Sequence, residues 1–236
     1  MTAHTVAEAF AAAAARLTGP DDVAGSLIAL LGDCVALMQV DAAGLLVHVP
    51  GEGLELLSTT SHAATVLELY ELQNGHGPCI EAIERNVVVS AGSSDLARRW
   101  APVGSAILGA GYQAVYAFPL RWNDHAVGAL NLFAGTVSPL DGEREQLGQA
   151  FANMAVAIVA LPSGANWAAV YDKIVQVLAE RVNIERAKGV LAVQRDIDLA
   201  DAFTVLVETA AGDNVPLADC AAQVLASVQR PAADHS

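Results

Sequence analysis

Apolar residues recur along this chain with two different spacings, and each spacing predicts one kind of secondary structure. An alanine-rich segment at 5–17 predicts a short helix, which the following Thr-Gly-Pro sequence should end. In the next segment, to about residue 38, apolar side chains recur every three or four residues, as on a helix with one buried face. Asp21 or Asp22 stands where a side chain can cap its first turn. We also expect the Cys34 thiol, which falls within the apolar stripe, to be buried.

From about residue 40 the pattern changes to short apolar runs separated by turn-forming residues. Segments 44–49 and 54–60 flank a Pro-Gly turn, so they predict a β-hairpin. Segments 114–121 and 126–133 predict two further strands joined by a four-residue turn. The remaining expected elements are helices at 62–72, 80–85, 103–109 and 139–160, a strand at 87–89 and irregular chain at 93–100. This order predicts an α+β domain whose mostly antiparallel sheet is flanked by helices.

A Leu-Pro-Ser-Gly-Ala-Asn sequence at 161–166 favours a hinge, and the chain beyond it has a purely helical pattern. Apolar residues recur there at alternating steps of four and three from Val170 to Leu191, with Arg181 and Lys188 as polar members. This seam indicates a coiled coil on a long helix, or a helix that packs on the later helices of its own domain, expected at 198–211 and 216–228. The expected division is an N-terminal helix at 1–20, a first domain at 21–161, a hinge at 162–166, an all-α three-helix domain at 167–230 and a tail at 231–236.

Composition narrows the classes of protein to which the chain can belong. Its formal net charge of −14 argues against indiscriminate binding of nucleic acid, which needs a positive field, although a small basic site remains possible. Three widely spaced cysteines do not form a disulfide framework and favour a reducing cytoplasm. We expect neither a signal peptide nor a membrane-spanning helix, because no apolar run approaches about 18 residues.

The most reactive-looking sequence is His76-Gly77-Pro78-Cys79, in which a histidine precedes a cysteine by three residues. Such a pair could activate a thiolate or supply half of a metal site, but no second set of ligands has metal spacing. The alternatives are a structural loop whose cysteine turns inward and a loop that lines a ligand pocket. No nucleophile elbow, phosphate-binding loop or dinucleotide fingerprint is present, so we expect no enzyme activity, no metal and no cofactor.

Three basic residues of the helical segment, Arg181, Lys188 and Arg195, are spaced by seven and therefore lie along one helix face. A basic stripe of this kind can meet the phosphates of RNA or DNA. The alternative is ordinary salt-bridged surface charge, because several carboxylates are close in sequence. Gly189, directly after Lys188, costs a helix about 1 kcal/mol relative to alanine. We therefore expect another helix or a ligand to approach the backbone closely at this point.

Three segments of the first domain match a known family. They are Gly75-His76-Gly77-Pro78-Cys79 and the paired segments 111–120 and 127–133. On these residues, the chain from about 23 to 160 resembles a GAF domain, a small-molecule sensing and dimerisation module. The resemblance implies a ligand pocket on one face of the sheet. The candidate pocket residues are His76, Cys79, Trp100, Phe118 and Trp122.

A second group of matching residues lies in the helical domain. It comprises the sequence Ile-Glu-Arg-Ala-Lys-Gly-Val-Leu at 184–191, then Ala202, Phe203 and Leu206, then Ala210, Asn214, Leu217, Ala218 and Ala221. On these residues, the chain from 167 to 228 resembles an ANTAR domain, a three-helix RNA-binding module of transcription antitermination. A GAF domain followed by an ANTAR domain is a familiar order in actinobacterial regulators. The resemblance implies RNA contacts by Lys188, Arg195, Arg186, Asn214 and Ala187.

The helical domain departs from the family pattern at Val207 and Glu208, because an arginine usually follows the residue that corresponds to Leu206. Residues 167–230 hold six Lys and Arg against nine Asp and Glu. We expect a cytoplasmic homodimer whose GAF domain senses a small molecule or a state and whose ANTAR domains bind RNA stem-loops in a leader transcript. The acidic balance leaves open a degenerate ANTAR domain that binds a protein partner. Thiol-dependent reduction of oxidised methionine, known in some GAF folds, would need a resolving cysteine near Cys79, and none is near in sequence.

Overall fold

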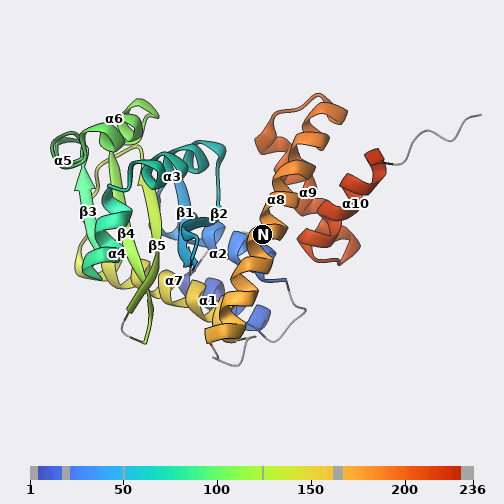
Figure 1. Cartoon of the computed structure of the whole chain (residues 1–236), viewed down its shortest axis with the longest axis horizontal. Coiled ribbons are helices and arrows are strands. Elements are labelled where there is room, and N and C mark those ends of the chain that lie inside the picture. Colours follow the sequence, from blue (N-terminus) through green and yellow to red (C-terminus); the bar gives the residue numbers. More distant parts are fainter. Residues whose placement is uncertain (1–4, 18–21, 50, 124, 162–166, 230–236) are drawn as a thin grey trace, which may run out of the picture.

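The computed structural model describes residues 5–17, 22–49, 51–123, 125–161 and 167–229, which form a sheet flanked by helices and a helical domain beside it (Figure 1). Within these residues the strand order is β2-β1-β5-β4-β3, and each neighbouring pair is antiparallel. The strands are β1 (Ala42–Val49), β2 (Gly53–Thr59), β3 (Val89–Gly92), β4 (Ala114–Trp122) and β5 (His125–Ala134). The expected α+β fold with a mostly antiparallel sheet is therefore confirmed.

Successive side chains of each strand point to opposite sides of the sheet, so both faces carry apolar side chains. Helices cover both of these faces. One face is covered by helices α1 (Val6–Leu17), α2 (Val23–Met38) and α7 (Gly142–Ala160). The other face is covered by helices α3 (His62–Asn74), α4 (Pro78–Arg85), α5 (Ser93–Arg99) and α6 (Ala101–Gly109). In β1, for example, Leu45 packs on the first face and Leu46 on the second.

Side-chain caps determine where several helices begin. Asp22 Oδ1 accepts the backbone N–H of Gly25 at 2.9 Å, so Asp22 caps α2. Ser61 caps α3 in the same way. Asp141 caps α7 by accepting the N–H of Arg144 at 2.9 Å, which is why this helix begins at 142 and not at the expected residue 139.

The structure differs from the sequence interpretation between residues 87 and 100. The strand expected at 87–89 lies at 89–92, where it pairs with β4, and residues 93–99 form α5 in place of irregular chain. An ion pair between Arg98 and Asp95, one turn apart at 2.6 Å, lies on this short helix. Gly104 allows α6 to approach the backbone of α5, because an added Cβ would collide with the carbonyl group of Leu96.

The helical domain comprises α8 (Trp167–Arg195), α9 (Leu199–Asp213) and α10 (Leu217–Gln229), close to the three helices that the sequence predicts. Asp198 caps α9 by accepting the N–H groups of Ala200 and Asp201, both at 2.8 Å. Asn214 ends α9 with a φ of 53°, a left-handed conformation that asparagine tolerates. The buried contacts between the three helices include Ala187, Leu191, Ala202, Leu206, Leu217 and Ala221.

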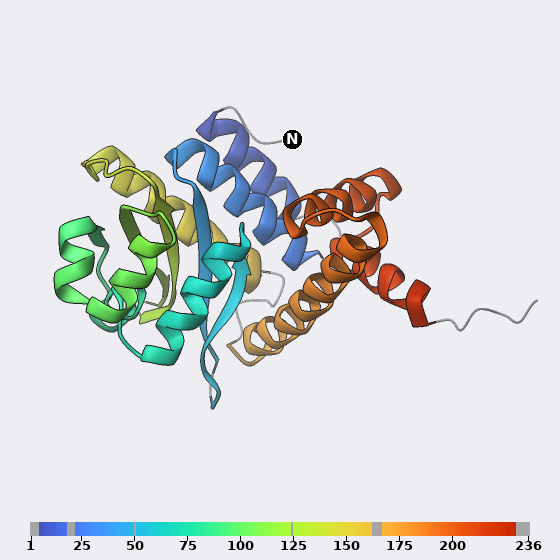
Figure 2. The same ribbon diagram turned by 90° about the horizontal axis from the view of Figure 1, so that it is seen from above.

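Helix α8 also packs on the first domain, beside β2 and α2 (Figures 1 and 2). Val170 and Ile174 of α8 line a small apolar cavity of about 30 Å³ together with Leu57 of β2. The Arg181 guanidinium donates a hydrogen bond of 3.1 Å to the Leu56 carbonyl oxygen. The apolar seam of α8 is thus buried within the chain, against the sheet in its first half and against α9 and α10 in its second.

Three expected features lie outside the described residues: the helix stop at 18–20, the hinge at 162–166 and the tail at 231–236. Among the helices that are described, none combines the length and the apolar character needed to cross a membrane.

Candidate functional site

The Gly75–Cys79 loop is held by a buried carboxylate that the sequence interpretation did not identify. Glu71, near the end of α3, accepts the backbone N–H groups of Cys79 at 2.7 Å and Ile80 at 3.2 Å through its Oε1 atom. These N–H groups belong to the first turn of α4, where a negative charge is stabilised by the helix dipole. Gly77 is required by close approach, because an added Cβ would collide with the Glu71 carboxylate.

A second buried carboxylate, Glu68, lies one helical turn before Glu71. The Asn131 side-chain amide donates to both of its oxygen atoms, at 2.9 and 2.8 Å, and all three residues are almost fully buried. Burial, and secondarily the charge of Glu71, raises the pKa of Glu68 well above its ordinary value. Burial raises the pKa of Glu71 to about 7, although its hydrogen bonds with the backbone of Ile80 and Cys79 oppose this rise.

The Cys79 thiol turns inward at the start of α4 and is fully buried. Burial and the neighbouring carboxylates raise its pKa well above the ordinary value, so the thiol stays protonated. His76 is exposed at the surface of the loop. Within the described residues, no group of three or more His, Cys, Asp and Glu side chains is arranged to hold a metal ion. The geometry fits the structural-loop interpretation of this motif.

The structure does not bring the candidate pocket residues into one cavity. Trp100 is buried on the face of the sheet that α3 to α6 cover, and Cys79 belongs to a small apolar cluster on the same face. Phe118 and Trp122 lie on the opposite face, where the Phe118 ring packs against Gly148 of α7. Trp122 lines the apolar cavity beneath α8. The sheet therefore separates these side chains into two groups.

The basic stripe of α8 is divided between two environments. Arg181 and Lys188 face the first domain, and Lys188 Nζ lies 2.9 Å from both carboxylate oxygens of Glu185. The Lys188 side chain is only 12% exposed and its ammonium lies 5.1 Å from the centre of the Phe203 ring. Arg195, at the end of α8, is exposed to solvent.

The other candidate RNA-binding residues also differ in exposure. Arg186 and Asn214 are exposed, whereas Ala187 is fully buried among the three helices. The Ala187 side chain therefore packs between the three helices of the domain. An added Cβ at Gly189 would meet no atom within 4 Å, so the expected close approach is absent within the described residues.

Comparison with protein families assigns one family to the sheet domain and another to the helical domain. The family description of the GAF domain matches residues 2–159. The chain belongs to the GAF domain family. The family description of the ANTAR domain matches residues 172–225, so the two domains follow one another along the chain. Both are sensor and regulatory domains, and the chain fits a signal-responsive regulator.

One solved structure with a TM-score above 0.5 supports the GAF fold. The GAF domain from an Acinetobacter phosphoenolpyruvate-protein phosphotransferase is 10% identical, with a TM-score of 0.52 over 70% of this chain and 98% of that chain. A domain of a putative two-component sensor histidine kinase protein from Sinorhizobium meliloti 1021 is 14% identical, covering 54% of this chain and 83% of that one, with a TM-score of 0.43. A comparison with curated proteins gave no match.

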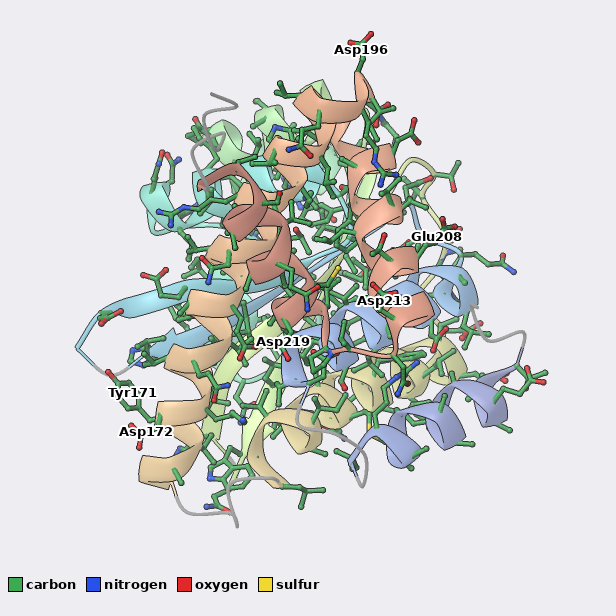
Figure 3. All side chains as sticks on the ribbon, turned by 90° about the vertical axis from the view of Figure 1, so that its right-hand side faces the viewer. Tyr171, Asp172, Asp196, Glu208, Asp213 and Asp219 are labelled. Carbon is green, nitrogen blue, oxygen red and sulfur yellow. The ribbon has the colours of Figure 1, made fainter. Side chains whose placement is uncertain are left out.

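The outward face of the ANTAR domain is acidic. Figure 3 shows carboxylates spread over it from the turn after α8, from α9 and from α10: Asp196, Glu208, Asp213 and Asp219. Val207, at the position where the family usually has an arginine, is exposed on α9. A face of this charge would repel a phosphate backbone.

Sequence reasoning missed the buried carboxylates because α3 looks like an ordinary solvated helix. The available signal was the pair of acids at Glu68 and Glu71, spaced by three and followed by a glycine-rich loop. Asn131 gave a second signal, as a polar residue within the apolar strand β5. A buried amide needs a hydrogen-bonding partner, and here that partner is the carboxylate of Glu68.

Proposed function

We propose that this chain is a cytoplasmic, signal-responsive regulator of transcription antitermination. Its GAF domain would sense a small molecule or a state, and its ANTAR domain would bind RNA stem-loops in a leader transcript. The observation that carries the proposal is the ANTAR match over 172–225, together with two exposed arginines, Arg186 and Arg195, on its first helix. Guanidinium groups suit phosphate contacts because they present paired donors and keep their charge.

Lys188 links the signal to RNA binding. With α8 docked on β2, its ammonium pairs with Glu185 and its side chain is largely buried. Lys188 also lines the cavity between the two domains, so a phosphate contact by Lys188 needs α8 to move relative to the GAF domain. The signal would act by changing the fraction of molecules in which α8 is undocked from the GAF domain.

A homodimer would present two RNA-binding modules at once. Val175, Val182 and Val193 lie along one exposed face of α8, and Val193 is 85% exposed. Covering this face with a second copy would remove apolar surface from water. Two weak sites in one dimer also gain from their effective concentration, which helps an acidic domain to hold RNA.

The test is native mass spectrometry of the full chain with an RNA pool in which two hairpins carry randomised loops. We expect a complex of two chains with one RNA, and weaker binding of single-hairpin RNAs. Val182→Glu should weaken both dimerisation and RNA binding. Absence of any RNA complex at low salt would reject the proposal.

A second candidate function is the binding of a protein partner by a degenerate ANTAR domain. The observation that favours it is the acidic outward face, which includes Glu208 of α9, together with Val207 in place of the usual arginine. In that case a pull-down with the full chain would recover a protein and no RNA. Neutralising Glu208 and Asp213 should then weaken recovery of the partner.

A further inference from the structure

A cavity of about 250 Å³ lies between the two domains, away from the Gly75–Cys79 loop. The GAF domain contributes residues from α2 and from the junction of β2 with α3, and the ANTAR domain contributes residues from α8 and α9. Neither domain encloses this space alone. The cavity therefore exists only while α8 is docked on the GAF domain.

Two cations reach the cavity from α8. Arg181 and Lys188 line it, and Glu185 is the carboxylate among the lining residues. The Lys188 ammonium has three N–H donors, and the two oxygens of Glu185 lie within hydrogen-bond distance of it. Arg181 has five N–H donors and uses one on the Leu56 carbonyl oxygen. Both cations therefore keep N–H donors for a further acceptor.

The backbone adds to this positive character. Helix α3 begins at His62, and its first turn lines the cavity. The N-terminal end of a helix carries partial positive charge, which favours an anion nearby. In a chain with a formal net charge of −14, two cations and the N-terminal end of α3 at one cavity make a local site for negative charge.

The rest of the lining is apolar or carries hydroxyl groups. Ile28, Ile184 and the Phe203 ring form apolar walls, while Thr59 and Thr204 contribute hydroxyls. Pockets for drug-sized ligands measure about 300–1,000 Å³. A cavity of about 250 Å³ therefore fits a smaller molecule, with an apolar body about the size of one ring.

We propose that this cavity binds a small organic anion, a carboxylate or a phosphate on a compact apolar body. The anionic group binds Lys188 and Arg181, and the apolar body packs between Phe203 of the ANTAR domain and Ile28 of the GAF domain. Because the ligand contacts both domains, it stabilises their docked arrangement by mass action. Lys188 then stays away from RNA. This regulatory consequence rests on the proposed function, whereas anion binding itself does not.

Isothermal titration calorimetry with the full chain tests the site, using phenyl phosphate and benzoate as anions and phenol as the neutral analogue, all at one ionic strength. At least one anion should bind, while phenol should bind at least about tenfold more weakly. Which anion binds more tightly identifies the preferred head group. Equal binding of phenol, or no binding of either anion, would overturn the proposal.

Three variants locate the binding. Lys188→Gln should weaken anion binding by about tenfold or more, and Thr204→Met should weaken it by filling the cavity without changing its charge. Lys173→Gln removes a cation of the same helix outside the cavity and should leave the affinity unchanged. Circular dichroism confirms that each variant is folded. If both cavity variants were folded and still bound the anion with wild-type affinity, the proposed site would be wrong.

RNA binding is measured separately, with and without the bound anion. Anion binding without any RNA binding would reject the proposed function and leave the site standing. Anion binding that leaves RNA affinity unchanged would reject the regulatory consequence alone.

Discussion

Glu71→Gln removes the buried ionisable group beside the first turn of α4, while keeping the size of the side chain and a carbonyl oxygen that can accept hydrogen bonds. In the folded chain, Glu71 is 2% exposed and accepts two backbone N–H groups of α4. The glutamine carbonyl can accept the same N–H groups. The variant therefore separates the charge of this residue from its hydrogen bonds.

The magnitude follows from the pKa of Glu71, which rises from its ordinary value of 4.5 to about 7 on burial. Folding favours the protonated acid, so the stability from this group is complete below pH 4.5 and is lost as the pH rises to about 7. The loss amounts to about 3 kcal/mol. Glutamine stays neutral, so the free energy of unfolding of the variant should gain about this amount relative to wild type between pH 4.5 and 8.

Urea denaturation at several pH values, followed by tryptophan fluorescence, measures this difference. Hydrogen exchange of the Cys79 and Ile80 amides reports on α4 itself. Glu84→Gln, which removes an exposed carboxylate of the same helix, should leave the pH dependence as in wild type. If Glu71→Gln also followed the wild-type pH dependence, the buried carboxylate would not be the titrating group and our reasoning would be wrong.

Gly148→Ala should destabilise the GAF domain by about 1–3 kcal/mol in urea denaturation, because the added methyl group would collide with the Phe118 ring. Unchanged stability would show that the ring can move. Arg181→Met should speed hydrogen exchange in β2, since the bond to Leu56 is lost, and unchanged exchange would contradict a role for this bond in docking. The buried Cys79 thiol should react with a neutral thiol reagent only after unfolding, and fast reaction of the folded chain would refute this.

Local patterns in the sequence were sufficient to predict most helices and strands of the fold. Short apolar runs located β4 and β5 within about one residue, and the capping residues Ser61 and Asp198 placed the starts of α3 and α9. These features depend on neighbours within a few residues, which a single sequence displays. Helix α5 was missed because its short segment contains two arginines and few apolar residues, so no periodic apolar face marks it.

The candidate site was harder to predict because it depends on contacts distant in sequence. The seam of α8 was correctly located, but its periodicity cannot tell a second chain from the sheet of the same chain. Docking on β2 turns Arg181 and Lys188 toward the GAF domain and leaves Arg195 in solvent. A spacing of seven places cations on one helix face without showing what that face contacts.

The central claim is that the ANTAR domain binds RNA through the arginines of α8, and the salt dependence of binding tests it most directly. For two-hairpin RNA, the logarithm of the wild-type affinity should fall linearly with the logarithm of salt concentration. Arg186→Gln and Arg195→Gln should each reduce that slope by about 0.7–1, and Lys173→Gln should leave it unchanged. No RNA binding at low salt, or equal slopes for wild type and both arginine variants, would contradict the account.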